Sequence, residues 1–594
     1  MNRLLLAALA LWSAALPARA QDPRERVYNY EILTPSHVSK PPVEGFASQR
    51  IRERLGRSLT ARLTPDGKGV HLSWRLLESD HPEIGFEVYR TADGKTELLN
   101  RKPVAATTDF TDPAPVEKAR YRIVPRYGDE RLEASGEIEV DMAALQAGKP
   151  YTAIPVTGRV GKLGVGDLDG DGEYDFVVRT PDTNVDPGVQ GPHYDSVYTI
   201  AAYRRTGEKL WEYSLGEGVE PGVWYSPFVV YDFDGDGRAE VALRICPDGK
   251  RDDRHRVGSG SEYLVVLDGL TGREIARAPW IERTPRLGDL NRQNRHQIGM
   301  AFLDGRTPAI IVARGTYRAM LAEAWQLHDG RLTRLWRWDG DEENPVVRSQ
   351  GSHNMVAGDA DGDGRDEILL GGCMLDDNGT LLWSAGIGHP DKIYMTDIDP
   401  RRPGMEVLLC GEISNDAGRG VCCVDAATGA QVWNIGIPTT HVGDGMVADI
   451  DPKHPGLECF AKEDRKAGSE CRYLLTARGK RLDDRPIPDC RNWVWWDGDL
   501  LRETIRGTRI VKWPDETVAE GIEGAILLIA DLTGDWREEI VTAVDGELRI
   551  YGTNLPARDR RTALMQDPLY RSYVAERSQG YPQSPVPSYY MGEK

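Results

Sequence analysis

Acidic loops are the part of this sequence whose residue types and spacing most directly indicate chemistry. The pattern Asp-x-Asp-Gly-Asp-Gly-x-x-Asp/Glu occurs in full at residues 167–175, 232–240 and 359–367. Carboxylates at positions 1, 3, 5 and 9, with a backbone carbonyl at position 7, form an oxygen-only ligand set that is typical of Ca²⁺ sites. The predicted ligands are Asp167, Asp169, Asp171, Glu173 and Asp175, then Asp232, Asp234, Asp236, Arg238 and Glu240, and finally Asp359, Asp361, Asp363, Arg365 and Glu367.

Further copies of the loop vary this pattern. Two longer copies and one near the C-terminus keep acidic ends, so they are also predicted Ca²⁺ sites. Their ligands are Asp397, Asp399 and Glu406, Asp449, Asp451 and Glu458, and Asp531, Asp535 and Glu539. A copy at Asp289 has Asn291 and Gln293 in place of carboxylates, so it is the weakest candidate. We expect most of these ions to be structural and to offset much of the net charge of −19.

The elements that must position these loops are short strands. Apolar strand-like residues flank each loop, and segments such as 207–211, 379–383 and 429–433 follow a turn with a strand that ends in Trp. Loop starts recur every 38 to 82 residues, a spacing that suits one four-stranded blade per repeat. Seven copies plus an unmarked blade around residues 492–497 predict an all-β, eight-bladed β-propeller over residues 150–594.

The N-terminal part predicts an export signal and a smaller β domain. Residues 1–20 have the charge, apolar stretch and Ala-Arg-Ala end of a signal peptide, with cleavage after Ala20, so we expect a secreted or periplasmic protein. Residues 40–145 alternate apolar and polar residues in short runs, which indicates a β-sandwich of the fibronectin type III kind. Some of the eight cysteines are expected to pair in an oxidising compartment.

Composition excludes two classes of partner. The net charge of −19, without clustered basic residues, argues against nucleic acid. After the signal peptide no segment is apolar enough to span a membrane. The sequence is silent on the oligomeric state.

Several segments also carry a family resemblance. They are residues 70–77, 166–175, 351–354, 386–389, 448–458, 495–500, 534–539 and 581–585. On these segments the sequence resembles the rhamnogalacturonan lyases of polysaccharide lyase family eleven, which cleave the pectin backbone. The resemblance implies a fibronectin-like module, an eight-bladed propeller with Ca²⁺, an acidic plant-type polysaccharide as partner, and β-elimination at galacturonate in a cleft on the propeller.

The same resemblance suggests site residues. Tyr581 matches a family tyrosine that donates a proton or positions the substrate, whereas Asp444 and Glu523 stand where the family has Arg and Lys. The neighbouring candidates for the base or for carboxylate recognition are His353, His389, Lys392 and His441.

Two other functions stay open at this point. Asp444 and Glu523 could form the acid and base of a glycoside hydrolase if they face each other across the cleft. Alternatively, the chain could be a non-catalytic glycan-binding propeller with Trp495, Trp496 and Tyr225 as stacking surfaces.

Overall fold

Strands make up most of the regular structure in the computed structural model of this chain. The structure describes residues 30–35, 39–184, 196–253, 256–464, 470–482 and 485–592. The predicted signal peptide lies outside the described residues. In the part of the chain that is described, no helix has the length and hydropathy needed to cross a membrane.

The N-terminal residues form a β-sandwich of two sheets. One sheet has the order β1–β2–β5, and the other has the order β4–β3–β6–β7 with β8 also paired to β6. Alternate residues of β6, such as Tyr121 and Ile123, pack with Trp74 and Phe86 in the core between the sheets. The strands are β1 (Thr60–Leu63), β2 (Val70–Ser73), β3 (Gly85–Ala92), β4 (Lys95–Leu98), β5 (Asp109–Asp112), β6 (Lys118–Tyr127), β7 (Glu130–Arg131) and β8 (Ile138–Asp141), followed by helix α1 (Met142–Ala147).

The remaining described strands form eight further sheets, seven with four strands and one with three. The first four contain β10 (Lys162–Gly166), β11 (Asp175–Thr180), β12 (Thr199–Tyr203) and β13 (Lys209–Ser214); β14 (Phe228–Tyr231), β15 (Glu240–Ile245), β16 (Tyr263–Asp268) and β17 (Glu274–Pro279); β18 (His296–Ala301), β19 (Ala309–Arg314), β20 (Leu321–His328) and β21 (Arg331–Asp339); and β22 (Val356–Gly358), β23 (Glu367–Leu369), β24 (Cys373–Leu375) and β25 (Leu381–Ser384). The last four contain β26 (Pro390–Thr396), β27 (Glu406–Gly411), β28 (Val421–Asp425) and β29 (Gln431–Asn434); β30 (His441–Ala448), β31 (Glu458–Asp464) and β32 (Glu470–Leu475); β33 (Trp493–Val494), β34 (Glu503–Arg506), β35 (Arg509–Lys512) and β36 (Glu516–Glu520); and β37 (Ala525–Ala530), β38 (Glu539–Val544), β39 (Glu547–Tyr551) and β9 (Thr152–Pro155).

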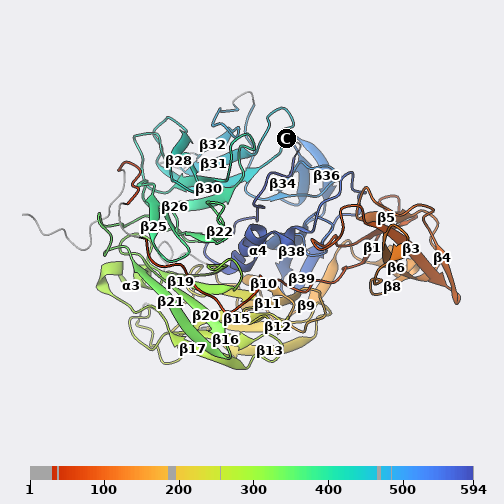
Figure 1. Ribbon diagram of the computed structural model, residues 1–594, viewed down its shortest axis with the longest axis horizontal. Coiled ribbons are helices and arrows are strands. Elements are labelled where there is room, and N and C mark those ends of the chain that lie inside the picture. The colour runs from red at the N-terminus through yellow and green to blue at the C-terminus, as the bar shows by residue number, and fades with distance from the viewer. Residues whose placement is uncertain are drawn as a thin grey trace, which may run out of the picture.

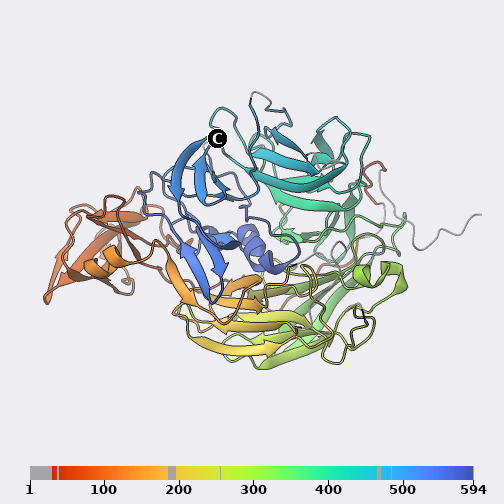
Figure 2. The same cartoon turned by 180° about the vertical axis from the view of Figure 1, so that it is seen from behind.

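These sheets follow one another around a centre, as the blades of a propeller do (Figure 1). Seen from the opposite side, the sandwich projects from the edge of this ring (Figure 2). The ring is closed by β9, which comes from the start of the region but pairs antiparallel with β39 near its end. The closing strand therefore joins the two ends of the ring by backbone hydrogen bonds.

A repeated tryptophan contact joins neighbouring sheets. A Trp in the fourth strand of a sheet donates its indole N–H to a backbone carbonyl of the following sheet, over 2.7 to 2.9 Å. The donor and acceptor pairs are Trp211 and Gly269, Trp336 and Asp377, Trp383 and Ala426, and Trp433 and Ala477. The segments predicted from the sequence as strands ending in Trp therefore connect one sheet to the next.

The C-terminal residues fill the centre of the ring. Helix α4 (Pro568–Ala575) is buried there, and its Arg571 donates to the carbonyls of Val165 in β10 and Val230 in β14. Farther along, Gln583 exchanges two hydrogen bonds with the backbone of Ile393 in β26. These contacts fix the tail that carries Tyr581 against the inner strands of several sheets.

Acidic loops join the first and second strands of most of these sheets. In each of six loops a carboxylate at the end accepts the N–H of the residue at position 2 of the loop. The six donors are Phe233, Ala360, Ile398, Ile450, Trp496 and Leu532. Residues 495–503 are therefore a further copy of the loop, with Trp495 in place of the first Asp, in the region predicted to be unmarked.

Two predictions from the sequence need correction. Asp289 does not begin an acidic loop, because its side chain caps helix α3 (Leu290–Gln293) ahead of β18. The loop of that sheet is residues 302–308, where Asp304 accepts the N–H groups of Arg306 and Thr307. The expected cysteine pairs are also absent, since all eight thiols are free within the described residues.

Candidate functional site

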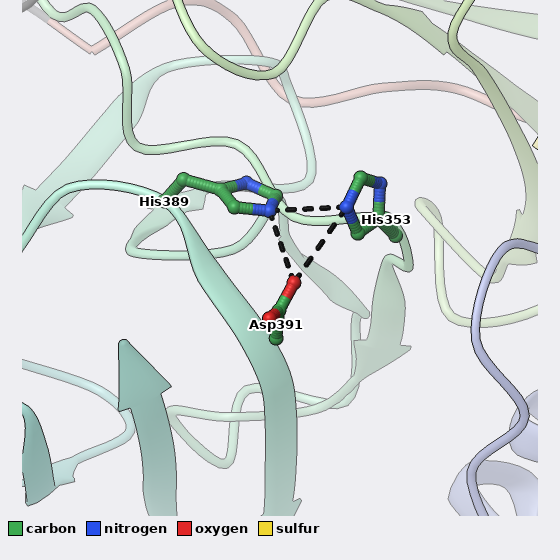
Figure 3. Close-up of side chains that lie close together, drawn as sticks. All are labelled: His353, His389 and Asp391. Carbon is green, nitrogen blue, oxygen red and sulfur yellow. Dashed lines mark hydrogen bonds and ion pairs between the residues drawn. The ribbon is translucent and has the colours of Figure 1, made fainter. Parts of the chain in front are cut away.

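Two histidines and an aspartate meet beside the inner strands of the ring. His353 precedes β22, His389 immediately precedes β26, and Asp391 is the second residue of β26, so the ends of neighbouring sheets bring them together. The Nε2 atoms of the two rings are 3.2 Å apart, and Asp391 Oδ1 lies 3.3 Å from His389 Nε2 and 3.6 Å from His353 Nε2 (Figure 3). All three side chains are buried.

A second carboxylate lies beside this cluster. Glu412 Oε2 lies 3.5 Å from His389 Nε2, and it is buried without a hydrogen-bond partner. The other ring nitrogen of His389 contacts the Gly351 carbonyl, which fixes the orientation of the ring. The two imidazoles and the Asp391 carboxylate converge closely enough to share a divalent metal ion, and Glu412 lies beside this group at His389.

Packing holds His353 in place and keeps it neutral. Its ring stacks on Trp224, with centroids 4.4 Å apart, and Arg295 Nη1 lies 3.3 Å from its Nε2. Burial, together with the positive charges nearby, holds the pKa of His353 well below its ordinary value. Nε2 of this neutral imidazole faces both the Arg295 guanidinium and the His389–Asp391 pair, so a metal ion bound there would replace its contact with Arg295.

A cleft of about 710 Å³ opens beside this cluster. The lining includes Asp391, Lys392, His441, Asp444, Arg491 and Tyr581. Asp391 links the cleft to the cluster, because its Oδ2 lies 2.8 Å from His441 Nε2 while Oδ1 faces the buried histidines. Burial lowers the pKa of Lys392, whose ammonium donates to the Pro582 carbonyl.

Tyr581 is placed in the cleft by the C-terminal tail. Its backbone N–H and carbonyl pair with the side chain of Asn354, and its ring packs edge-on against His353 and Trp224. Lys392 Nζ lies 5.4 Å from the ring centroid. The phenol therefore stands between the histidine cluster and the open cleft.

Most of the catalytic candidates from the sequence come together here, but one does not. His353, His389, Lys392, His441, Asp444 and Tyr581 all lie in the cleft or in the cluster behind it. Glu523 is not among the lining residues, and its exposed carboxylate pairs with Arg549 at 2.8 Å. The carboxyl pair that a hydrolase would need is therefore not assembled in this cleft.

Sequence reasoning missed Asp391, Glu412 and Arg491. Asp391 is two residues beyond His389 in a Gly-His-Pro-Asp segment, and that His-x-Asp spacing at a strand start was an available signal. Glu412 follows β27 in the same sheet as Asp391, and its backbone N–H donates to the His389 carbonyl, whereas Arg491 precedes β33 of another sheet. Both are distant in sequence from the Gly-His-Pro-Asp segment, so no local pattern marks them.

The three full acidic loops also gather their carboxylates. Those of Asp167, Asp169 and Asp171, of Asp232, Asp234 and Asp236, and of Asp359, Asp361 and Glu367 converge closely enough to share one ion. Glu367 Oε1 and Asp175 Oδ2 are buried without hydrogen-bond partners. Burial and the neighbouring carboxylates raise the pKa of Glu240 and Glu367 to about 9, so these sites fit a cation.

The variant loops differ in their counter-charges. Arg402 pairs with Glu406, while Arg401 and Arg478 pair with Asp399. In the last loop, Arg537 pairs with Asp535, and Arg62 from the sandwich reaches Glu539.

Among the described residues, no lysine or arginine forms an ion pair with a carboxylate of loop 449–458. Tyr590 donates its hydroxyl to Asp449, and Glu458 Oε1 is buried without a hydrogen-bond partner. In this buried oxygen without a partner, loop 449–458 resembles the full copy at 359–367, where Glu367 Oε1 is buried in the same way.

Comparison with known proteins agrees with this combination of a sandwich, a ring of four-stranded sheets and a polar cleft. Residues 138–594 match the family described as "Rhamnogalacturonan lyase family 11, C-terminal domain", and residues 50–140 match "Rhamnogalacturonan I lyases beta-sheet domain". The chain belongs to rhamnogalacturonan lyase family 11.

Its relatives include two proteins of Bacillus subtilis. The chain is 35% identical to rhamnogalacturonan endolyase YesW, over 95% of this chain and 94% of that protein. It is 34% identical to rhamnogalacturonan exolyase YesX, over 92% of this chain and 96% of that protein.

Solved structures of such lyases share the fold. The crystal structure of YesW superposes with a TM-score of 0.82 at 34% identity, covering 92% of this chain and 98% of that chain. The rhamnogalacturonan lyase of Bacillus licheniformis gives the same values.

Proposed function

We propose that this protein cleaves rhamnogalacturonan by β-elimination at galacturonate, in the cleft lined by Asp391, His441 and Tyr581. The observation that carries the proposal is that the cleft joins Tyr581 to the His353–His389–Asp391 cluster in a member of this lyase family. β-Elimination needs a base for the proton α to the uronate carboxylate, positive charge near that carboxylate, and a proton donor for the leaving oxygen.

The side chains of the cleft can fill these roles. His441 is held through Nε2 by Asp391, which leaves its other ring nitrogen to take the proton from the sugar. Tyr581 then donates its phenolic proton to the leaving glycosidic oxygen. A divalent ion held by His353, His389, Asp391 and Glu412 would supply Lewis-acid stabilisation for the uronate carboxylate.

The proposal extends to the fold and its ions. The eight sheets closed by β9 support an eight-bladed propeller over residues 150–594, with a fibronectin type III-like module at residues 40–145. The converging carboxylates of the three full loops support several structural Ca²⁺ ions. The sequence of residues 1–20 supports export with cleavage after Ala20.

Incubation of the mature chain with rhamnogalacturonan and Ca²⁺ tests the activity, with ultraviolet absorbance and reducing ends followed together. We expect both signals to grow in parallel, because elimination leaves an unsaturated uronate. H441A and Y581F should each lower kcat by roughly a hundredfold or more, the range for losing a general base or acid.

E523Q serves as the control, because Glu523 does not line the cleft, and it should keep wild-type activity. Reducing ends without absorbance would indicate hydrolysis. Binding without either signal would indicate a non-catalytic propeller, and either result would overturn the proposal.

A further inference from the structure

The charges that line the cleft are balanced rather than positive. Its acidic residues are Asp391, Asp444, Asp464 and Asp489, and its Lys and Arg residues are Lys392, Arg491, Arg506 and Arg577. Rhamnogalacturonan alternates rhamnose with galacturonate, so it brings a carboxylate on every second sugar of its backbone. A cation in this cleft binds such a carboxylate only if it faces the open space and has N–H groups that are not already committed to the protein.

Three of the four cations do not meet that condition. Lys392 and Arg577 are buried and so do not face the open space. They donate to backbone carbonyls of Pro582, Leu527 and Gln583, and Arg577 Nη2 is enclosed without a hydrogen-bond partner. Arg506 is mostly covered, and its three nitrogens donate to the Thr504 hydroxyl, the Asp515 carboxylate and the Pro514 carbonyl. These three side chains shape the cleft and support its walls.

Arg491 differs from them in both exposure and geometry. Half of its side chain is exposed, at 51%. Nε and Nη2 bind the two oxygens of Asp489, over 2.9 and 2.8 Å, so one edge of the guanidinium is fixed by a two-point contact. The remaining nitrogen, Nη1, lies 3.6 Å from Asp444 Oδ2, beyond ordinary hydrogen-bond distance.

Asp489 and Asp444 therefore orient this guanidinium from two sides. Asp489 sets the plane of the group, and the charge of Asp444 draws Nη1 toward the cleft. A planar guanidinium that is oriented in advance loses little conformational freedom when it binds a carboxylate. Because Nη1 is not hydrogen-bonded to Asp444, it can bind a ligand carboxylate without breaking a hydrogen bond to the protein.

We infer that Arg491 is the residue that binds a galacturonate carboxylate of the substrate, with Asp489 and Asp444 as its positioning residues. This inference rests on the proposed function, because it assumes that the ligand of the cleft is a uronate polymer. It gives Asp444 a role in electrostatics rather than in proton transfer.

Steady-state kinetics of R491Q on rhamnogalacturonan test the inference. We expect KM to rise roughly tenfold to a hundredfold, the effect of losing a hydrogen bond between charged groups, while kcat changes less. R491K keeps the charge but not the planar fork, so its KM should fall between those of R491Q and the wild type.

A neutral ligand separates carboxylate recognition from a structural effect. Rhamnogalacturonan oligosaccharides whose carboxyl groups have been reduced to alcohols should inhibit the wild type and R491Q with equal Ki, because they offer Arg491 no carboxylate. R509Q is the control: its side chain is exposed and does not line the cleft, so its KM should stay within about twofold.

Two results would overturn the inference. One is a KM of R491Q equal to that of the wild type, and the other is an equal rise in KM and in the Ki of the reduced oligosaccharide. If the wild type forms no unsaturated product, the proposed function fails, and equilibrium binding of the acidic and reduced oligosaccharides replaces the kinetics. R491Q must then lose the wild-type preference for the acidic form, or the inference about Arg491 fails as well.

Discussion

The acidic loops 232–240 and 495–503 hold the same place in their sheets but differ in the source of positive charge. In both, a terminal Glu accepts the N–H of the second loop residue, Phe233 or Trp496. In loop 232–240 three aspartates converge, and Arg238 pairs with Asp236 on the exposed side. In loop 495–503 the ammonium of Lys512 lies among the carboxylates.

The contacts of Lys512 resemble those of a bound cation. Its Nζ lies 2.5 Å from Asp497 Oδ2, 2.6 Å from Asp499 Oδ2 and 3.5 Å from Glu503 Oε1. These carboxylates occupy positions 3, 5 and 9 of the loop, the positions of Asp234, Asp236 and Glu240 in the other copy. The Lys512 ammonium therefore occupies the place that a bound cation would take in loop 232–240, so a side chain of the next strand can supply the positive charge here.

Removal of divalent cations should produce the largest difference in stability between the two loops. A chelator should lower the thermal midpoint strongly, since each site loses about 2.7 kcal/mol when the ion had been present at a hundred times its Kd. Hydrogen exchange should accelerate in peptides covering residues 228–245 but not in those covering 493–512. Equal acceleration in both regions would show that Lys512 does not replace an ion.

Replacing the lysine should convert one kind of loop into the other. K512M leaves three carboxylates together without their cation, so we expect a loss of about 3 kcal/mol in chelator, as for a broken buried ion pair. Added Ca²⁺ should restore the stability, and the variant should bind one more Ca²⁺ than the wild type in a calorimetric titration. R509Q, on the exposed side of the same strand, is the control and should match the wild type in both measurements. An unchanged Ca²⁺ stoichiometry in K512M would contradict the comparison.

The sequence predicted the repeated sheets because the loop ligands are local. Asp232, Asp234, Asp236 and Glu240 lie within nine residues, so one turn determines their geometry, and the spacing of such turns reports one sheet each. The acidic loop at 495–503 was not predicted because Trp495 replaces its first Asp. Its cation could not be predicted, since Lys512 reaches the carboxylates only through the pairing of β34 with β35.

The same distinction applies to the cleft. Tyr581, His353 and His389 were found through segments that resemble a family, and the structure brings them together. Arg491 meets the site only because separate sheets converge at the centre of the ring, and Glu412 meets it only through the pairing of β26 with β27. Glu523 was assigned to the cleft by alignment alone, but its side chain turns instead to Arg549 on β39.

The smallest expected effect concerns a carboxylate that has arginine partners away from any acidic loop. Glu87 in β3 accepts hydrogen bonds from Arg131, Arg126 and the Tyr89 hydroxyl, and these contacts, led by Arg131, lower its pKa to about 2. A carboxylate whose pKa is lower in the folded state adds stability at pH values above its unfolded pKa near 4.5, and that stability is lost as the pH falls toward 2.

Because both arginines are partly exposed, E87Q should cost only about 1 kcal/mol at pH 7. The difference in thermal midpoint between E87Q and the wild type should narrow steadily below pH 4.5. The control is E97Q: Glu97 on β4 is an exposed partner of Arg90, so this variant should have nearly the wild-type thermal midpoint at every pH. If the difference in thermal midpoint between E87Q and the wild type stays constant from pH 7 to pH 3.5, Glu87 stabilises the sandwich through packing. Its arginine partners would then not provide electrostatic stabilisation of the kind that Lys512 provides in loop 495–503.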